Sequence, residues 1–340
     1  MAERALVCPQ CNGPLSPGRF ARSVVCSYCG ATVTLDEASV EAARFRRAYE
    51  DWNTPARHGF TSWLEVAQTR WAPGPLLARG ETCDVYAARR ARWPSERALV
   101  KVLRDDAHEP LVDHEWTVLT ELRARTPDAA AALLGRIPEP IVRGRVSNGA
   151  YAGRYVMVLR APGGFRHTLD DVRRAFPAGI DPQSSLWVWR RILEVLAFLH
   201  ERGLAHGAVL PRHLLVEDGE HGLRMVGFSA ADRPDAPLRT VVEDARAFYP
   251  PGPGGGTVSP RADVAMSARC LAFLLGGEPA TGSVPTSVPA ALAELVRETA
   301  RADLDDAEGR LEAWPLRERL GTLAREVFGP PKFCPLVVPD

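Results

Sequence analysis

The chain has 340 residues, of which 46% are apolar and 25% charged, and its formal net charge is 0. This composition is typical of a soluble globular protein, and the length suffices for two or three domains of roughly 100–200 residues. The balanced charge gives no general attraction to nucleic acid or to an anionic membrane. No apolar run reaches the roughly 18 residues of a membrane span, and the first residues lack the apolar core of a signal peptide. A cytoplasmic protein without a membrane partner is therefore expected.

The basic residues are nearly all arginine, because lysine occurs only at Lys101 and Lys332. The excess of Arg, Ala, Pro and Gly is typical of GC-rich coding DNA and indicates a bacterial source. Lysine carries a compact ammonium and arginine a planar fork, so the two are not interchangeable in a tight pocket. A lysine that persists against such a bias therefore indicates a position where its own chemistry is needed.

Four of the seven cysteines form two CxxC pairs within residues 1–35, namely Cys8, Cys11, Cys26 and Cys29, with fourteen residues between the pairs. This spacing is typical of a zinc ribbon, in which four thiolates hold Zn²⁺ and the metal supplies most of the stability of a small module. A pair of redox CxxC motifs is the alternative, but no βαβ pattern surrounds them. The segment has few basic residues and no aromatic run. Nucleic acid is therefore not the expected partner. The expected role is contact with protein or only structural stabilisation by the metal.

Residues 36–73 are interpreted as a helical linker. An apolar stripe predicts a helix over 36–52, and residues 53–72 are expected to be irregular, with tryptophans that dock on the next domain.

Two stretches after the linker resemble parts of the protein-kinase fold. Residues 77–86 resemble the glycine-rich phosphate loop, in which Gly80 is the one remaining glycine of three and Val85 would cover the adenine. The alternating strand 98–103 matches the family pattern V-A-I-K and places its lysine at Lys101.

The resemblance extends to the rest of a small lobe, expected over residues 74–160. Glu115 stands in the following helix as the acid that pairs with the lysine of the family, and Met157 would lie at the back of the nucleotide pocket. We therefore expect a Lys101–Glu115 pair, which either serves a nucleotide or only clamps the lobe.

The catalytic part of the pattern is degraded in residues 206–229. The family has H-R-D-L-K-P-x-N followed by D-F-G. Here Ala208 replaces the catalytic Asp, His213 the metal-binding Asn and Gly227 the metal-binding Asp. A methyl group cannot act as a base, and imidazole is a poor ligand for hard Mg²⁺.

The residues that hold the frame are kept. His206 matches the structural His of the loop, and Asp263 matches the Asp that fixes the loop backbone in the family. The resemblance therefore implies an α+β, bilobal protein-kinase-like domain, with a β-rich small lobe and a helical large lobe at 161–327, preceded by a small zinc ribbon. A proline-rich tail, 328–340, either packs back on the large lobe, which we favour, or presents an extended segment to a partner.

We expect a catalytically inactive pseudokinase that acts as a regulatory or scaffold protein for partner proteins. Zinc would be structural, and ATP or another nucleotide would be bound, if at all, without Mg²⁺. One alternative is an enzyme of altered chemistry, with phosphoryl or nucleotidyl transfer that uses Lys101 and Glu115. Another is a ribbon-directed nucleic-acid or protein-complex adaptor with the kinase-like domain as passive support.

Overall fold

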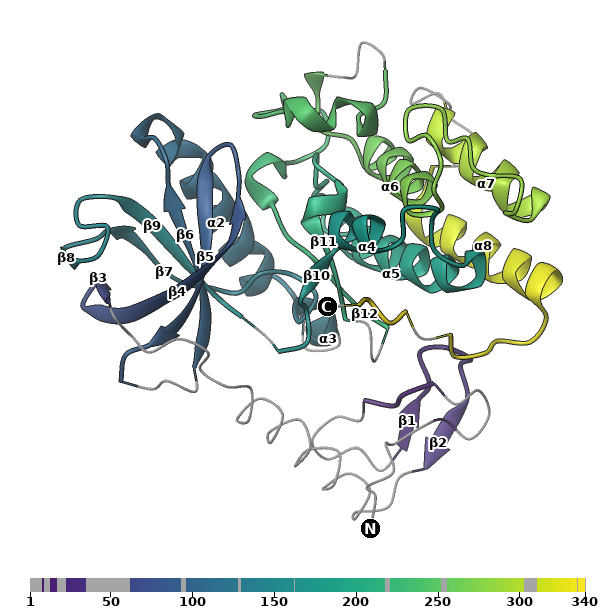
Figure 1. Ribbon diagram of the computed structural model, residues 1–340, viewed down its shortest axis with the longest axis horizontal. Coiled ribbons are helices and arrows are strands. Elements are labelled where there is room, and N and C mark those ends of the chain that lie inside the picture. The colour runs from purple at the N-terminus through teal and green to yellow at the C-terminus, as the bar shows by residue number, and fades with distance from the viewer. Residues whose placement is uncertain are drawn as a thin grey trace.

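The structure is a computed structural model. It describes residues 8, 13–16, 23–34, 62–92, 96–127, 130–161, 163–217, 221–251, 256–302, 311–334 and 336–339. Figure 1 shows a β-rich small lobe, a helical large lobe and a small two-stranded module below the large lobe. In this described part of the chain, no helix combines the length and apolar character that crossing a membrane requires.

The small lobe is built on a seven-stranded sheet with the order β7-β9-β6-β5-β4-β3-β8. Buried side chains alternate with less buried ones along β6, as expected for a strand with one face on a core. The strands are β3 Leu64–Val66, β4 Thr69–Arg79, β5 Cys83–Arg90, β6 Arg97–Leu103, β7 Pro140–Arg145, β8 Asn148–Gly149 and β9 Tyr155–Arg160.

The first strands of this sheet correct the expected linker. Residues 64–66 and 69–73 form antiparallel strands, with Leu64 opposite Trp71, whereas an irregular connection was predicted there. Leu64 and Trp71 are fully buried, so these apolar residues belong to the core of the sheet. The small lobe therefore begins near residue 64 and not at 74. The helix predicted over 36–52 lies outside the described residues.

Helix α2, Glu109–Ala124, covers the face of the sheet that looks toward the large lobe (Figure 1). Its buried positions Val112, Glu115, Leu119 and Leu122 recur at helical spacing, and one of them is charged. The short α3, Ala131–Leu134, follows.

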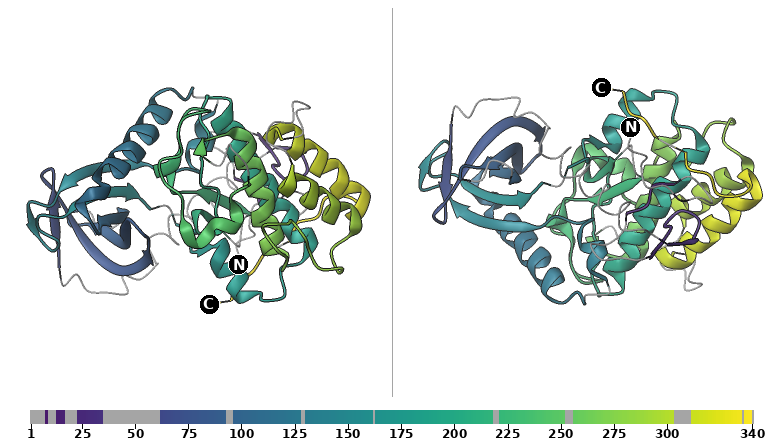
Figure 2. Two further views of the ribbon diagram at one scale, coloured as in Figure 1. Left: turned by 90° about the horizontal axis from the view of Figure 1, so that it is seen from above. Right: turned by 90° about the horizontal axis from the view of Figure 1, so that it is seen from below.

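The large lobe is organised around α5, Pro182–His200, which is apolar on nearly all sides. Asp181 caps this helix by accepting a hydrogen bond from Ser184 N at 2.9 Å. The surrounding helices are α4 Leu169–Ala175, α6 Pro260–Leu274, α7 Ala290–Arg301 and α8 Ala313–Phe328. A three-stranded sheet of β10 His167–Thr168, β11 Leu214–Glu217 and β12 Gly222–Met225 lies beside α5, and the two views of Figure 2 place the lobes at opposite ends of the molecule.

The two-stranded module consists of β1, Ser23–Val25, and β2, Thr32–Thr34, which pair antiparallel around the second CxxC. The C-terminal tail runs back from α8 across the large lobe (Figure 1). Leu336 and Val338 of this tail are buried, which agrees with the favoured expectation that it packs on the lobe.

Candidate functional site

A buried carboxylate at the start of α6 holds the loop that resembles a catalytic loop. Asp263, which is fully buried, accepts hydrogen bonds from the backbone N–H groups of His206 at 2.6 Å and Gly207 at 2.8 Å. The ring of His200 lies 3.1 Å from the same carboxylate. Hydrogen bonds to a buried charge are among the strong ones, so Asp263 fixes the path of the loop.

His206 joins this loop to the strand that follows it. Its Nε2 donates to Val226 O at 3.0 Å, and its Nδ1 accepts from Ala208 N at 3.3 Å. Burial lowers the pKa of His206 by more than the charge of Asp263 raises it, so the ring is neutral. It meets Phe228 edge to face, at 4.7 Å between ring centroids. His206 therefore stabilises the loop through these contacts and stays neutral.

The position at which the resemblance predicts a catalytic base is buried and apolar. Ala208 is 2% exposed and lies within the main core. Its methyl group offers neither a proton acceptor nor a lone pair, so the loop contains no general base at this point.

The corner expected to bind metal contains a histidine ring packed on a glycine. Gly227 has φ +82°, and a Cβ built on it would lie 2.7 Å from the His213 ring. Only glycine fits there without a shift of the ring or the backbone. His213 Nδ1 donates to Ala208 O at 2.9 Å. Burial first, and then the neighbouring His206, lowers the pKa of His213 to about 3, so the ring is neutral.

Across the cleft, Lys101 on β6 forms an ion pair with Glu115 on α2. The Glu115 side chain is 1% exposed and that of Lys101 is 15% exposed, so the pair is buried. Burial lowers the pKa of Lys101, but the charge of Glu115, together with the hydrogen bond that Lys101 donates to this carboxylate, raises it by more. The lysine therefore stays charged, and the predicted pairing is present.

Sheet register places three of the residues expected around a nucleotide in one row. Val85 on β5 is directly opposite Lys101, and Lys101 is directly opposite Met157 on β9. Directly opposed residues point to the same face of a sheet. Leu99 lies on this face as well and packs against the main core, which leaves less space beside the lysine.

Gly80 forms the turn between β4 and β5. Its N–H donates to Cys83 O at 2.9 Å, and Arg104 donates to Gly80 O at 3.1 Å. The remaining glycine therefore belongs to a tight and anchored turn.

The described cysteines of the N-terminal module gather as a metal site requires. The sulfur atoms of Cys8, Cys26 and Cys29 all lie within 4.8 Å of one another, and those of Cys8 and Cys29 are 3.6 Å apart. Four sulfurs at about 2.3 Å from a tetrahedral Zn²⁺ would be about 3.8 Å apart. Cys11, the fourth predicted ligand, lies outside the described residues. The three described thiolates therefore fit a zinc site, and Cys11 stays a predicted fourth ligand.

The second CxxC also docks the module on the large lobe, which the sequence did not reveal. Ser27, between the two cysteines, accepts a hydrogen bond from Arg191 on α5 at 2.8 Å. Its neighbour Tyr28 contacts the rings of His221 and Phe333 edge to face, at 4.8 and 5.7 Å between centroids. An aromatic residue inside a metal-binding turn was the one signal available for this contact.

Comparisons with known proteins place the fold. No model of a known protein family matches the chain, and no curated protein matches it. Among solved structures, the BubR1 kinase domain matches with a TM-score of 0.58 and 15% identity, over 85% of this chain and 93% of that one. A rhoptry kinase from Toxoplasma gondii gives 0.56 and 14%, over 81% and 86% of the two chains.

The kinase domain of a Toxoplasma gondii specific rhoptry antigen gives a TM-score of 0.55 and 14% identity, over 83% and 92% of the two chains. At such low identities these matches establish the fold alone. The chain has a kinase-like α+β fold with a β-rich lobe and a helical lobe, as predicted.

Proposed function

We propose that this chain is a catalytically inactive kinase-like protein, a pseudokinase, that works as a regulatory or scaffold protein by binding partner proteins. The observation that carries the proposal is the contact of His213 with Gly227 in the corner where the family binds its metal ions. Phosphoryl transfer depends on positioned metal ions and on a base that orients the nucleophile. Ala208 replaces the base, and His213 and Gly227 replace the two metal ligands, so the side chains for both requirements are absent at these three positions.

The residues that match the family pattern are those that hold the loop, which supports the same conclusion. Asp263 and His206, which hold the loop backbone, are fully buried and hydrogen-bonded. The positions that would react are occupied by groups that pack, as at Ala208 and His213. A fold that keeps its frame and loses its reacting groups is suited to present a surface and not to transform a substrate.

Lys101 and Glu115 clamp β6 to α2 in this proposal. The Lys101 side chain keeps a 15% exposed fraction, and at positions 213 and 227 the cleft lacks the amide and carboxylate that bind Mg²⁺ in the family. A nucleotide in this cleft would therefore be bound without Mg²⁺. Zinc, held by the four cysteines, would stabilise the N-terminal module and the turn that docks on α5.

A transfer assay tests the absence of catalysis. The purified chain is incubated with ATP labelled at the α- or γ-phosphate, with Mg²⁺ or Mn²⁺, and with generic protein acceptors. We expect no transfer of phosphate or AMP. Transfer that is lost in Lys101→Ala and kept in Lys332→Ala would overturn the proposal in favour of an enzyme of altered chemistry.

A complementation test addresses scaffolding in the source cell. The double variant Lys101→Met, Glu115→Leu keeps a packed clamp but removes both charged groups of the cleft. We expect it to restore any phenotype of a deletion strain as well as the parent does. Failure of this variant, at a cellular level equal to the parent's, would indicate that the cleft performs chemistry.

A further inference from the structure

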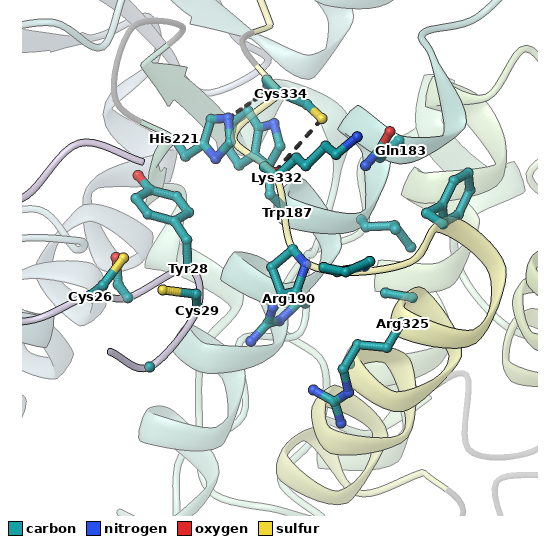
Figure 3. Close-up of a pocket in the computed structure, with 18 of the residues that line it drawn as sticks. Cys26, Tyr28, Cys29, Gln183, Trp187, Arg190, His221, Arg325, Lys332 and Cys334 are labelled. Carbon is teal, nitrogen blue, oxygen red and sulfur yellow. Dashed lines mark hydrogen bonds between the residues drawn. The ribbon is translucent and has the colours of Figure 1, made fainter. Parts of the chain in front are cut away.

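A second cavity, of about 420 Å³, lies where the N-terminal module meets the large lobe (Figure 3). Residues 25–30 form one wall, α5 and α8 form others, and the C-terminal tail closes the remaining side. This volume is in the range of small-molecule sites, and the walls bring together residues 25–30, α5 and the C-terminal stretch of α8 and tail, which are far apart in the chain.

The cavity lining holds five cationic residues, against one carboxylate and the two cysteines Cys26 and Cys29 of the predicted zinc site, in a chain whose formal net charge is 0. Glu194 is the one carboxylate among its lining residues, and it is already saturated, because Arg136, Arg191 and Arg317 donate to it at 2.7 to 3.0 Å. The five cationic lining residues are Arg190, Arg191, Arg317, Arg325 and Lys332.

Two N–H donors in the wall lack acceptors. Among the described residues, Nε of Arg190 and Nε1 of Trp187 have no hydrogen-bond partner, and Trp187 is only 8% exposed. These residues and Gln183 follow at spacings of four and three residues on one face of α5. Burial, and then the charge of Arg317, lowers the pKa of Arg190, and Glu194 only partly offsets this. Both donor atoms are closed to solvent, so a bound anion would reach them only after a small side-chain shift, which the cost of leaving a buried donor without an acceptor favours.

The second lysine of the chain lies at the same cavity. Lys332 is exposed and belongs to the tail, which is held beside it by a hydrogen bond of 2.5 Å between His221 Nε2 and Cys334 O and by stacking of Phe333 on His221. A coding bias that replaced lysine with arginine almost everywhere left lysine at Lys101, in the cleft, and at Lys332, in this lining.

We propose that this cavity is a binding site for a small polyanion that carries phosphate or carboxylate groups. Trp187 and Arg190 supply the inner donors, and Arg325 and Lys332 complete the charge nearer to solvent. Guanidinium groups bind both kinds of anion through paired charge-assisted hydrogen bonds. The site is separate from the kinase-like cleft and does not depend on whether that cleft is catalytic.

Calorimetry on the full-length, zinc-loaded protein tests the site, with sodium pyrophosphate and sodium citrate as probes and sodium chloride at matched ionic strength as reference. We expect saturable binding of pyrophosphate. Saturable binding of citrate with none of pyrophosphate would keep the site and assign it to carboxylates. Absence of saturable binding by both probes would overturn the proposal.

Variants locate the binding. Arg190→Gln should weaken the affinity at least about tenfold, the range expected for one hydrogen bond to a charged group. The double variant Arg325→Gln, Lys332→Gln changes only exposed positions and should weaken it similarly, so a folding defect in Arg190→Gln would not remove the test. Arg301→Gln, an exposed arginine on α7, should bind like the parent.

The outcome that would contradict this location is equally specific. If Lys101→Met, Glu115→Leu abolishes binding while Arg325→Gln, Lys332→Gln does not, the probe occupies the kinase-like cleft and the proposed site is wrong.

Discussion

The two lysines of this chain occupy opposite kinds of site. Lys101 lies in the cleft, where Glu115 neutralises it. Lys332 lies at a cavity in which cations outnumber carboxylates and buried donors have no acceptor. Lys101 is paired within the protein, whereas no ion pair of Lys332 is found among the described residues. The proposed anion site therefore lies away from the position of the active site in the kinase fold.

The largest expected difference between the two lysines is in the loss of unfolding free energy when each is replaced. Lys101→Met leaves the Glu115 carboxylate buried without its partner and should lower the free energy of unfolding by about 3–5 kcal/mol. Lys332→Met alters an exposed side chain and should change it by less than about 0.5 kcal/mol. Urea denaturation measures both. Adding Glu115→Leu to Lys101→Met should recover most of the loss, and equal effects of the two lysine variants would contradict the distinction.

The packing of the His213 ring against Gly227 predicts the next largest effect. Gly227→Asp introduces a Cβ 2.7 Å from the His213 ring, at a backbone conformation that side chains rarely adopt. We expect a loss of about 2–4 kcal/mol in unfolding free energy, from crowding and from backbone strain.

Combining Gly227→Asp with His213→Asn should return about 1–3 kcal/mol of that loss, because the smaller side chain relieves the crowding. A double-mutant cycle by urea denaturation measures this coupling. Strict additivity of the two changes would show that the ring and the glycine do not constrain one another.

Acid should destabilise the cleft through His213. Its pKa is about 3 in the folded protein and near 6.5 in the unfolded chain, so between these values the unfolded state binds a proton that the folded state does not. Stability is complete above pH 6.5 and falls as the pH decreases toward 3, by up to about 1.4 kcal/mol per pH unit from this residue. Urea midpoints between pH 7.5 and 4.5 should fall less steeply in His213→Asn. Parallel curves for the two proteins would contradict the assignment.

The docking of the N-terminal module should contribute least. Tyr28→Ala removes the contacts with His221 and Phe333, and also the cation–π contact in which Arg191 lies 5.2 Å from the Tyr28 ring. We expect a loss of about 1–2 kcal/mol of docking free energy. Faster hydrogen exchange at residues 25–30 and weaker binding of pyrophosphate would report the loss of docking. The zinc content should not change.

The kinase-like core was predictable because its signals are local and consistent. The strand that carries Lys101, the helix that carries Glu115 and the apolar helix α5 each have the periodicity of their element. Their order along the chain was enough to indicate the two-lobed fold. The ion pair followed from matching one lysine to one acid in that order.

The first hairpin of the sheet was not predictable, because its turn and strand lack the usual residues. Ala67 and Gln68 form the turn with φ of 44° and 61°, whereas turns of this kind are typically built from Asn, Asp or Gly. Pro73 then interrupts the strand pattern, and the register of β4 shifts after it. Burial of Trp71 outweighs these local signals.

The second cavity could not be read from sequence, since its walls meet only in the folded chain. Ser27 and Arg191, which join the module to α5, are separated by 164 residues. A basic residue on a predicted buried helix, such as Arg190, gave no indication of what faces it. Only Lys332, as the second lysine, marked the region in advance.

The contact of His213 with Gly227 has a consequence for the descent of this chain. A carboxylate at position 227 is excluded while the imidazole is present, and a smaller residue at 213 alone would leave a gap beside a glycine that cannot bind metal. A lineage that had acquired both residues could not regain metal binding by a single substitution. In such a lineage a return to metal binding would need two coordinated changes, at 213 and at 227.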